Sequence, residues 1–396
     1  MAPVATRSHG IVASSLAYLT VTRSTATLLV SMSYERPSIQ RLEAYVPGEQ
    51  PADIDGVIKL NTNENPYPPA SAVMQAIQDL PPEALRRYPP PDAGSFRAVA
   101  AAVHGVRCNQ VIATNGGDEL LRLAVTVFCE PTGDRGHGGI GVTEPSYSLY
   151  SVLGAIANTP VTSICRTSDF DLPPDLANRW NAEGCRLGFI VNPHAPSGSL
   201  TPLATLHSLA EAFNGVLLVD EAYVDFASAD ALSLVRPDGE ALDNVLLLRS
   251  LSKGYSLAGL RFGYGIGAAP LIAALDKARD SYNTDVLSQA VAVAAIQQPD
   301  VARAGWQRIQ VQRKRLGDEL GDRGYRVYPS QANFLLVEPP TGGSTARQLY
   351  EALRAKRILV RHFDSDRLRD TLRITIGTDR QHDSLLAVLD EVAGKY

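Results

Sequence analysis

The sequence predicts an α/β fold, with a mostly parallel central sheet covered by helices on both faces, and a smaller α+β domain. Two observations carry this prediction. From about Val111 onward, short β-branched runs alternate with longer stretches of helical periodicity, which is typical of βαβ units. Near Ala290 this alternation gives way to one long helical pattern followed by short apolar runs, which indicates a separate unit.

Six apolar runs are the predicted strands of the central sheet, and several are continuous, as expected for strands buried on both faces. They are Val111–Ala113, Ile140–Val142, Leu187–Val191, Val216–Val219, Val245–Leu248 and Tyr264–Ile266. The stretch after Gly117 repeats apolar residues such as Leu120 and Ala124 at helical spacing. The C-terminal unit is predicted to contain a helix through Trp306 to Leu320, strands at Tyr325–Tyr328 and Phe334–Val337, a strand at Leu372–Ile376 and a last helix at Ser384–Val392.

At 396 residues the chain is long enough for two or three domains, and we predict four stretches. Residues 84–290 form a large domain, and residues 291–396 form a small domain to which an N-terminal arm, residues 35–83, also contributes. Residues 1–34 are an extension without an acidic residue before Glu35, which resembles a transit peptide. The interpretation that we favour is a translation start at Met32.

Composition and charge exclude several classes of protein. With 37 Lys and Arg against 42 Asp and Glu, the net charge is −5, so no nucleic-acid partner is expected. The four cysteines form no CxxC pair and the histidines have no metal-ligand spacing. We therefore expect no metal, no disulfide framework and a reducing, cytoplasmic setting, unless the extension is a genuine organellar transit peptide. Arg23 interrupts the apolar stretch 11–30, so no membrane span is expected.

A lysine at the end of a predicted buried strand is the most informative residue. Lys253 follows the run Val245–Leu248 among small and hydroxyl residues, and ligands of open α/β sheets bind outside the carboxyl ends of strands. Partial desolvation and the nearby cation Arg261 are expected to lower the pKa of Lys253, which suits Schiff-base chemistry. A solvated surface lysine is the alternative, and the neighbouring motifs argue against it.

Two further strand ends point to the same edge of the sheet. Asp220 ends the run Val216–Val219, with Tyr223 three residues later. A carboxylate there can keep a pyridinium nitrogen protonated, which makes a pyridoxal cofactor an electron sink; the alternative role is a helix N-cap. The turn from Asn115 to Glu119 lies between a strand and a helix, where main-chain N–H groups favour a phosphate.

Nine blocks of the sequence, in order, resemble those of the fold-type I pyridoxal-phosphate aminotransferases, and within them the histidinol-phosphate aminotransferases. The resemblance runs from Tyr45 to the C-terminus. The blocks are Leu60-Asn-Thr-Asn-Glu-Asn-Pro-Tyr, Arg87-Tyr-Pro, Asn115-Gly-Gly-Asp-Glu-Leu, Phe128-Cys-Glu-Pro, Glu144-Pro-Ser-Tyr-Ser-Leu-Tyr, Val219-Asp-Glu-Ala-Tyr-Val-Asp-Phe, Ser252-Lys with Leu257-Ala-Gly-Leu-Arg-Phe-Gly-Tyr, Gln331-Ala-Asn-Phe and Leu372-Arg-Ile-Thr-Ile-Gly-Thr.

The resemblance implies a transamination between histidinol phosphate and 2-oxoglutarate, a step of histidine biosynthesis, with pyridoxal 5′-phosphate as cofactor. Lys253 is then the Schiff-base lysine and proton shuttle, Asp220 the partner of the pyridine nitrogen, and Tyr223 a donor to the cofactor's phenolate oxygen. The implied cofactor-binding residues, besides these three, are Gly117, Asp118, Glu119, Tyr147, Asn192, Ser250, Ser252, Arg261 and Tyr88.

The resemblance also implies where the substrates bind and how the protein assembles. Arg373 is the expected ligand of the substrate carboxylate, and Arg361 is a second arginine for the acidic end of the substrate. Tyr45 and Asn333 are expected to line the same pocket. Tyr88 occupies the position that reaches the phosphate of a neighbouring subunit, so a homodimer with shared sites is expected.

One block departs from the family pattern. The chain reads Asn192-Pro-His-Ala-Pro-Ser-Gly, where the family usually has Asn-Pro-Asn-Asn-Pro-Thr-Gly. Ala195 falls where the second internal asparagine normally donates to the cofactor's phenolate oxygen. Losing one bond to a charged oxygen is worth about 1.5–3 kcal/mol and should raise the pKa of the cofactor imine. Tyr223 would then carry that contact, with His194 as the candidate for compensation.

The motifs leave the exact amine substrate open. Threonine-phosphate decarboxylases and aromatic or specialised aminotransferases share most of the blocks and are the nearest alternatives. A pyridoxal-binding regulator is a non-enzymatic alternative, and the lack of a helix-turn-helix pattern before Tyr45 counts against it.

Overall fold

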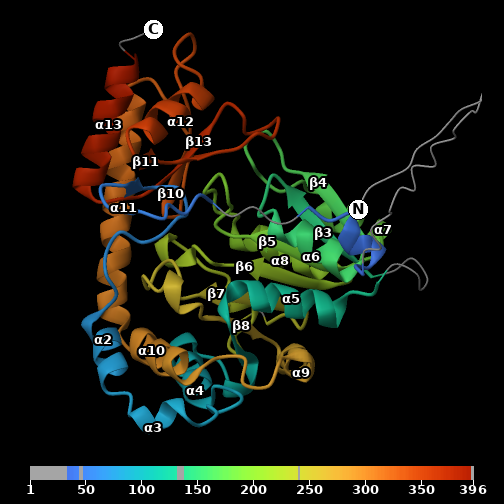
Figure 1. The fold of residues 1–396 in the computed structure, drawn as a ribbon. Coiled ribbons are helices and arrows are strands. Elements are labelled where there is room, and N and C mark those ends of the chain that lie inside the picture. The colour runs from blue at the N-terminus through green and yellow to red at the C-terminus, as the bar shows by residue number, and fades with distance from the viewer. Residues whose placement is uncertain (1–33, 44–47, 132–137, 240, 394–396) are drawn as a thin grey trace, which may run out of the picture.

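The structure is a computed structural model that describes residues 34–43, 48–131, 138–239 and 241–393. Its centre is a seven-stranded sheet in the order β2-β8-β7-β6-β5-β3-β4 (Figure 1). The strands are β2 (Val111–Thr114), β3 (Gly139–Glu144), β4 (Val161–Cys165), β5 (Cys185–Val191), β6 (Val216–Asp220), β7 (Val245–Ser250) and β8 (Gly263–Gly267).

The predicted α/β fold with a mostly parallel sheet is confirmed. Strands β4, β3, β5, β6 and β7 pair in parallel, whereas β8 is antiparallel to both of its neighbours. All six predicted strands are present. The seventh, β4, was not predicted, because it is an edge strand in which only Ile164 is buried, so it lacks a continuous apolar run.

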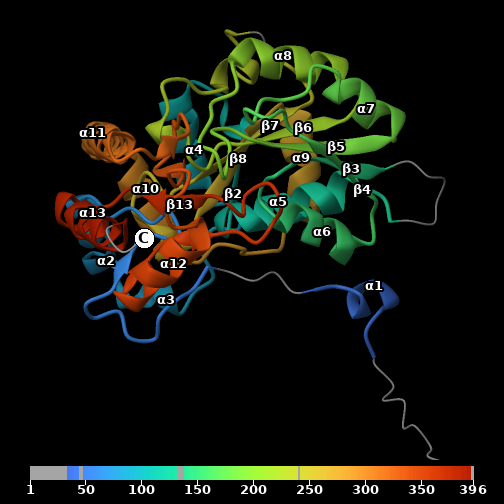
Figure 2. The same ribbon diagram turned by 90° about the horizontal axis from the view of Figure 1, so that it is seen from above.

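Helices cover both faces of this sheet, as Figure 2 shows for α7 and α8 on one face and α5 and α6 on the other. The first face carries α4 (Gly94–His104), α7 (Leu176–Ala182), α8 (Leu203–Ala212) and α10 (Val286–Ile296), which share one apolar core. The second carries α5 (Gly116–Phe128), α6 (Leu149–Ala157) and α9 (Ala269–Ala278), which share another. The predicted helix after Gly117 is therefore confirmed as α5, with Leu120 and Ala124 fully buried.

The C-terminal part forms a separate antiparallel sheet in the order β12-β13-β10-β9. Its strands are β9 (Arg326–Val327), β10 (Phe334–Glu338), β12 (Arg361–His362) and β13 (Leu372–Thr375). Around it lie α11 (Pro299–Asp322), α12 (Ala346–Ala355) and α13 (Asp379–Ala393). The predicted helices and strands of this part are all present, although α11 and α13 begin earlier than the sequence periodicity indicated.

The N-terminal arm packs against this C-terminal part. Strand β1 (Ile58–Lys59) pairs in parallel with β11 (Ile358–Leu359), and Leu60 is buried in the C-terminal core. The arm also contains α1 (Pro37–Gln40), α2 (Ser71–Gln78) and α3 (Pro82–Leu85), of which α2 packs against α10. The boundaries at residues 84 and 290 stay a prediction. Across the described residues, no helix combines the length and apolar character needed to cross a membrane.

Candidate active site

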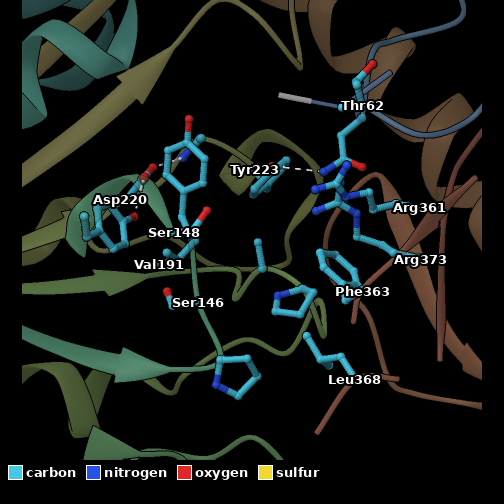
Figure 3. A pocket seen from close by; sticks show the side chains of 18 of the residues that line it. Thr62, Ser146, Ser148, Val191, Asp220, Tyr223, Arg361, Phe363, Leu368 and Arg373 are labelled. Carbon is cyan, nitrogen blue, oxygen red and sulfur yellow. Dashed lines mark hydrogen bonds between the residues drawn. The ribbon is translucent and has the colours of Figure 1, made fainter. Parts of the chain in front are cut away.

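A cleft of about 1390 Å³ lies where the carboxyl ends of the parallel strands face the C-terminal sheet. Strand β6 contributes Asp220 and β7 contributes Ser250, while β12 and β13 contribute Arg361 and Arg373 from the opposite wall. Figure 3 shows Asp220 and the two arginines at opposite ends of the cleft, with Tyr223 between them. The cleft therefore joins a sheet-end site to a cationic site.

Lys253 lies in the turn after β7 and lines this cleft. Its ammonium group donates to the main-chain oxygen of Thr62 at 3.0 Å. Loss of hydration, followed by the positive charges of Arg373 and Arg261, lowers the pKa of Lys253 to about 8. The expected direction is confirmed, and Arg373 contributes more than the predicted Arg261. A lysine with this pKa exchanges protons readily near neutral pH.

Asp220 is the last residue of β6 and is only 6% exposed. One carboxylate oxygen accepts from the Tyr150 hydroxyl at 2.7 Å, and the other accepts from the main-chain N–H of Ala222 at 3.0 Å. Burial raises the pKa of Asp220 to about 6, against the opposing effect of the Tyr150 hydrogen bond. The group is thus a buried carboxylate at neutral pH, and a cationic partner would stabilise its charge.

Tyr150 was not singled out from the sequence, although it closes the quoted block that begins at Glu144. Its hydroxyl is the phenol that donates to Asp220. Its ring is fully buried and stacks on Phe189 with centroids 4.6 Å apart. A sequence pattern contains no signal for this contact, because residues 150 and 220 meet only through the parallel order of β3, β5 and β6.

Tyr223 follows β6 and lines the cleft beside Lys253. Its hydroxyl oxygen accepts from the amide of Asn63 at 3.0 Å, and its ring meets Phe334 edge to face at 5.1 Å. Asn63 belongs to the N-terminal arm and also lines the cleft, yet the sequence did not single it out. The arm therefore supplies part of the wall between the sheet-end site and the C-terminal sheet.

The predicted phosphate site lies at the start of α5. Gly117, Asp118, Ser250, Ser252 and Arg261 all line the cleft there. The Arg261 guanidinium is 3.4 Å from the Asp118 carboxylate and about half exposed, so it keeps donors for an anion.

The first residue of α5, Gly116, has to be a glycine. Gly116 has φ +75°, and a Cβ at this position would lie 2.7 Å from the Arg261 guanidinium. A residue without a side chain thus lets the cation approach the first turn of α5, where the helix dipole favours negative charge.

Arg361 and Arg373 are direct cross-strand partners in the β12–β13 pair, so their side chains leave the same face of the sheet. The ring of Phe363 lies 5.5 Å from the first guanidinium and 5.6 Å from the second, and Arg373 also lies 5.2 Å from the Phe334 ring. Arg373 donates to the main-chain oxygen of Asn61 at 3.1 Å. Two oriented guanidinium groups can bind a phosphate or two carboxylates.

Tyr147 lines the cleft near this sheet end, and its hydroxyl is 3.4 Å from the Asp118 carboxylate. Other predicted residues lie beside the cleft without lining it. The Glu119 carboxylate accepts from the Asn283 amide at 2.9 Å, and the buried Asn192 amide oxygen accepts from a main-chain N–H at 2.7 Å. These two side chains hold the surrounding loops in place.

Two more predicted residues, Asn333 and Tyr88, are also outside the cleft lining. Asn333 is fully buried, and its amide donates to the main-chain oxygen of Asn63 at 3.0 Å. Tyr88 is 82% exposed and stacks on Tyr282 with centroids 4.6 Å apart. Tyr45 lies outside the described residues. The roles of these residues stay predictions.

The block that departs from the family pattern forms part of the cleft wall. Ala195 lines the cleft with its methyl group. His194 is fully buried; its Nε2 lies 2.8 Å from the Pro145 carbonyl oxygen, and its Nδ1 lies 2.7 Å from the Ser197 hydroxyl. Burial and the nearby Arg166 hold the pKa of His194 well below its usual value. The neutral imidazole therefore links its own loop to the segment that follows β3, and both ring nitrogens are engaged in these two contacts.

The class of the protein is defined by its similarity to known proteins. The chain belongs to the aminotransferase class I and II family, whose profile matches residues 55–389. Within that family, its relatives include histidinol-phosphate aminotransferases. The enzyme named histidinol-phosphate aminotransferase 1 from Nostoc sp. is 42% identical over 360 residues, covering 91% of this chain and 98% of the relative. The corresponding protein of Trichormus variabilis is 41% identical over 360 residues, covering 91% and 99%.

Solved structures agree with this placement. Histidinol-phosphate aminotransferase from Sinorhizobium meliloti, determined in complex with pyridoxal-5′-phosphate, has a TM-score of 0.81 at 26% identity and covers 92% of this chain and 99% of that one. L-threonine-O-3-phosphate decarboxylase from Porphyromonas gingivalis has a TM-score of 0.70 at 20% identity, covering 85% and 99%. The second likeness shows the fold alone. The chain is thus a fold-type I aminotransferase.

Proposed function

We propose that this chain is a pyridoxal-phosphate-dependent aminotransferase that transfers an amino group between histidinol phosphate and 2-oxoglutarate in histidine biosynthesis. The observation that carries the proposal is the gathering of Lys253, Asp220 and Tyr223 in one cleft with the paired arginines 361 and 373. Relatives of 41–42% identity that bear this activity in their names support the substrate.

The residues present fit the cofactor. Asp220 is a buried carboxylate at the sheet end, suited to a protonated ring nitrogen. Gly116 leaves room for Arg261 at the first turn of α5, and Ser250 and Ser252 lie beside it, which is the donor set that a phosphate requires. Lys253 supplies an amine of lowered pKa between these groups. When bound, pyridoxal phosphate supplies a ring that stabilises negative charge at the substrate Cα.

The chain's own residues then position the reactants and move the proton. Lys253, with a pKa of about 8, takes the proton from the Cα of the amino donor. In the second half-reaction it gives a proton to the Cα of the product amino acid. Asp220 keeps its negative charge next to the ring nitrogen. Arg361 and Arg373 hold the anionic end of the substrate, which is a phosphate in histidinol phosphate and a carboxylate in 2-oxoglutarate. One guanidinium pair therefore serves both half-reactions.

The complete site is proposed to need a second copy of the chain. Tyr88 and Tyr282 form an exposed stacked pair, and Leu85, Met74 and Ile77 are exposed apolar residues in the same part of the fold. Exposed aromatic and aliphatic side chains of this kind are typical of interfaces. In the proposed homodimer, Tyr88 reaches the partner's phosphate site, so a monomer would bind the cofactor weakly.

The proposed compartment is the cytoplasm. The four cysteines, Cys108, Cys129, Cys165 and Cys185, are free thiols in the structure. Reduced thiols are typical of proteins that work in a reducing compartment.

A direct assay tests the substrate. The cofactor-loaded protein is given histidinol phosphate and 2-oxoglutarate, and glutamate formation is measured beside a panel of other amines, threonine phosphate included. We expect glutamate to form fastest with histidinol phosphate. Activity with another amine but none with histidinol phosphate would remove the proposed pathway, and CO₂ release from threonine phosphate would favour a decarboxylase.

A further inference from the structure

Asn63 of the N-terminal arm connects the C-terminal sheet to Tyr223. It is buried, and its backbone has φ +55°, a left-handed conformation that asparagine adopts more readily than most residues. Its main-chain N–H donates to the hydroxyl of Thr375 at 3.0 Å. That hydroxyl lies 3.2 Å from the Asn63 amide oxygen, and the Asn63 amide nitrogen lies 3.0 Å from the Tyr223 hydroxyl. The dashed line that ends on Tyr223 in Figure 3 is this last hydrogen bond.

The two contacts of Thr375 set the direction of the other bonds. Its hydroxyl oxygen accepts from the Asn63 main chain, and its hydroxyl proton is donated to the Asn63 amide oxygen. The amide NH₂ then faces Tyr223, whose oxygen must accept. In the opposite orientation, the Asn63 amide nitrogen would face the Thr375 oxygen, which already accepts from the Asn63 main chain. The Thr375 hydroxyl proton would then have no acceptor on Asn63.

A phenol that accepts on one side directs its proton to another side. We propose that Asn63, oriented by Thr375, is a positioning residue that makes the Tyr223 hydroxyl an acceptor toward the arm and thereby a donor into the cleft, toward the phenolic oxygen of the cofactor. The inference rests on the proposed function for the presence of that cofactor. It assigns to a residue of the arm the task of setting the polarity of Tyr223.

The polarity of Tyr223 matters more here because of Ala195. Ala195 lines the same cleft and has a methyl side chain, which donates no hydrogen bond. Both ring nitrogens of the neighbouring His194 are engaged elsewhere, one by Ser197 and the other by the main chain of Pro145. Residue 195 therefore adds no second hydrogen bond to the phenolic oxygen beside that of Tyr223. A residue that fixes the direction of the Tyr223 proton accordingly has a larger effect on the charge of that oxygen.

The arm is fixed well enough to perform the task. The main-chain oxygen of Asn63 accepts from Asn333 at 3.0 Å, and the main-chain oxygen of the preceding Thr62 accepts from Lys253 at 3.0 Å. Thr375 and Asn333 are both buried in the C-terminal part. Asn63 is thus held from the C-terminal sheet while its amide points at the sheet-end site.

The test reads the proton that the bound cofactor shares with the Lys253 nitrogen. A donor to the phenolic oxygen stabilises its negative charge and lowers the pH at which the visible absorbance of the cofactor changes with protonation. Asn63→Asp keeps the size and tolerates the left-handed backbone, but replaces the donor toward Tyr223 with an acceptor. The Tyr223 proton then turns toward the introduced carboxylate, so we expect the midpoint of the absorbance titration to rise by about one pH unit or more.

Three further variants separate polarity from other effects. Asn63→Gly removes the amide while keeping the backbone conformation, and Thr375→Val removes the hydroxyl that orients it; both should raise the midpoint by less than Asn63→Asp does. Thr375→Ser keeps the hydroxyl and should restore the wild-type midpoint. In a Tyr223→Phe background, the negative charge added by Asn63→Asp still raises the midpoint of the titration. The rise should be smaller than in the Tyr223 protein, because the phenol proton that Asn63→Asp redirects is absent.

The outcomes are distinct. Unchanged midpoints in Asn63→Asp and Thr375→Val would overturn the inference while the wild-type titration leaves the proposed function standing. A shift in Asn63→Asp that is equally large in the Tyr223→Phe background would also overturn it, since the effect would then be charge alone. A wild-type protein without any visible cofactor band would overturn the proposed function itself.

Discussion

Replacing Asp220 by asparagine should make the cofactor-free protein more stable while removing its function. Burial raises the pKa of Asp220 from 3.8 to about 6. At 1.36 kcal/mol per unit, keeping this carboxylate ionised in the folded chain costs about 3 kcal/mol at neutral pH. An asparagine avoids the charge and fits the same partners, because its oxygen can accept from Ala222 and its amide can donate to the Tyr150 oxygen.

The pH dependence gives the prediction its sign. Between pH 3.8 and about 6 the folded protein holds more protons at Asp220 than the unfolded chain, so the wild type loses stability as pH rises through this window. Urea unfolding of cofactor-free Asp220→Asn should therefore show a gain of up to about 3 kcal/mol at pH 7.5 and little gain near pH 4. A variant that is less stable than the wild type at pH 7.5, or a gain that is independent of pH, would refute the reasoning.

Three other predictions concern the same cleft. Tyr150→Phe removes a hydrogen bond to the charged form of Asp220 and should therefore raise the pKa of Asp220. When cofactor affinity is measured against pH, the pH below which affinity falls should rise by about one unit. An unchanged pH profile of affinity would contradict this. Arg373→Lys replaces the planar guanidinium, which can donate two parallel hydrogen bonds to a carboxylate, with an ammonium group. Steady-state kinetics should show the KM for 2-oxoglutarate raised about tenfold or more, with a smaller change in kcat. A selective loss of kcat would argue against a binding role. Tyr88→Ala should change the free energy of unfolding of the single chain by less than about 0.5 kcal/mol, because Tyr88 is 82% exposed. It should nevertheless weaken cofactor binding to the dimer. Wild-type cofactor affinity in a variant that is still dimeric would show that Tyr88 does not belong to the site.

Continuous apolar runs made most of the central sheet predictable. Strands such as β6 and β7 are buried throughout or nearly so, and the polar residues at their ends, Asp220 and Ser250, could be placed at one sheet edge by the rule for parallel strands. The edge strand β4 was not predictable, because its half-exposed residues lack that signal. The reversed direction of β8 was not predictable either, since a buried strand carries the same apolar pattern in both directions.

Contacts between distant segments were the part of the site that the sequence could not show. Asn63 meets Tyr223 and Thr375 only because the arm crosses between the two sheets. Arg361 and Arg373 were expected to bind the substrate, but their direct pairing depends on the register of β12 and β13. The side chains of Glu119, Asn192 and Asn333 were expected at the site and lie beside the cleft, because their hydrogen bonds hold loops and the arm.

The central claim is that Lys253 is the residue that binds pyridoxal phosphate covalently. Borohydride reduction of the cofactor-loaded protein fixes that bond, and peptide mass spectrometry then locates it. The account predicts a pyridoxyl-phosphate group on the peptide that contains Lys253, and its loss when glutamate is added before reduction. Modification of a different lysine, or none at all on a protein that still transfers amino groups, would contradict it.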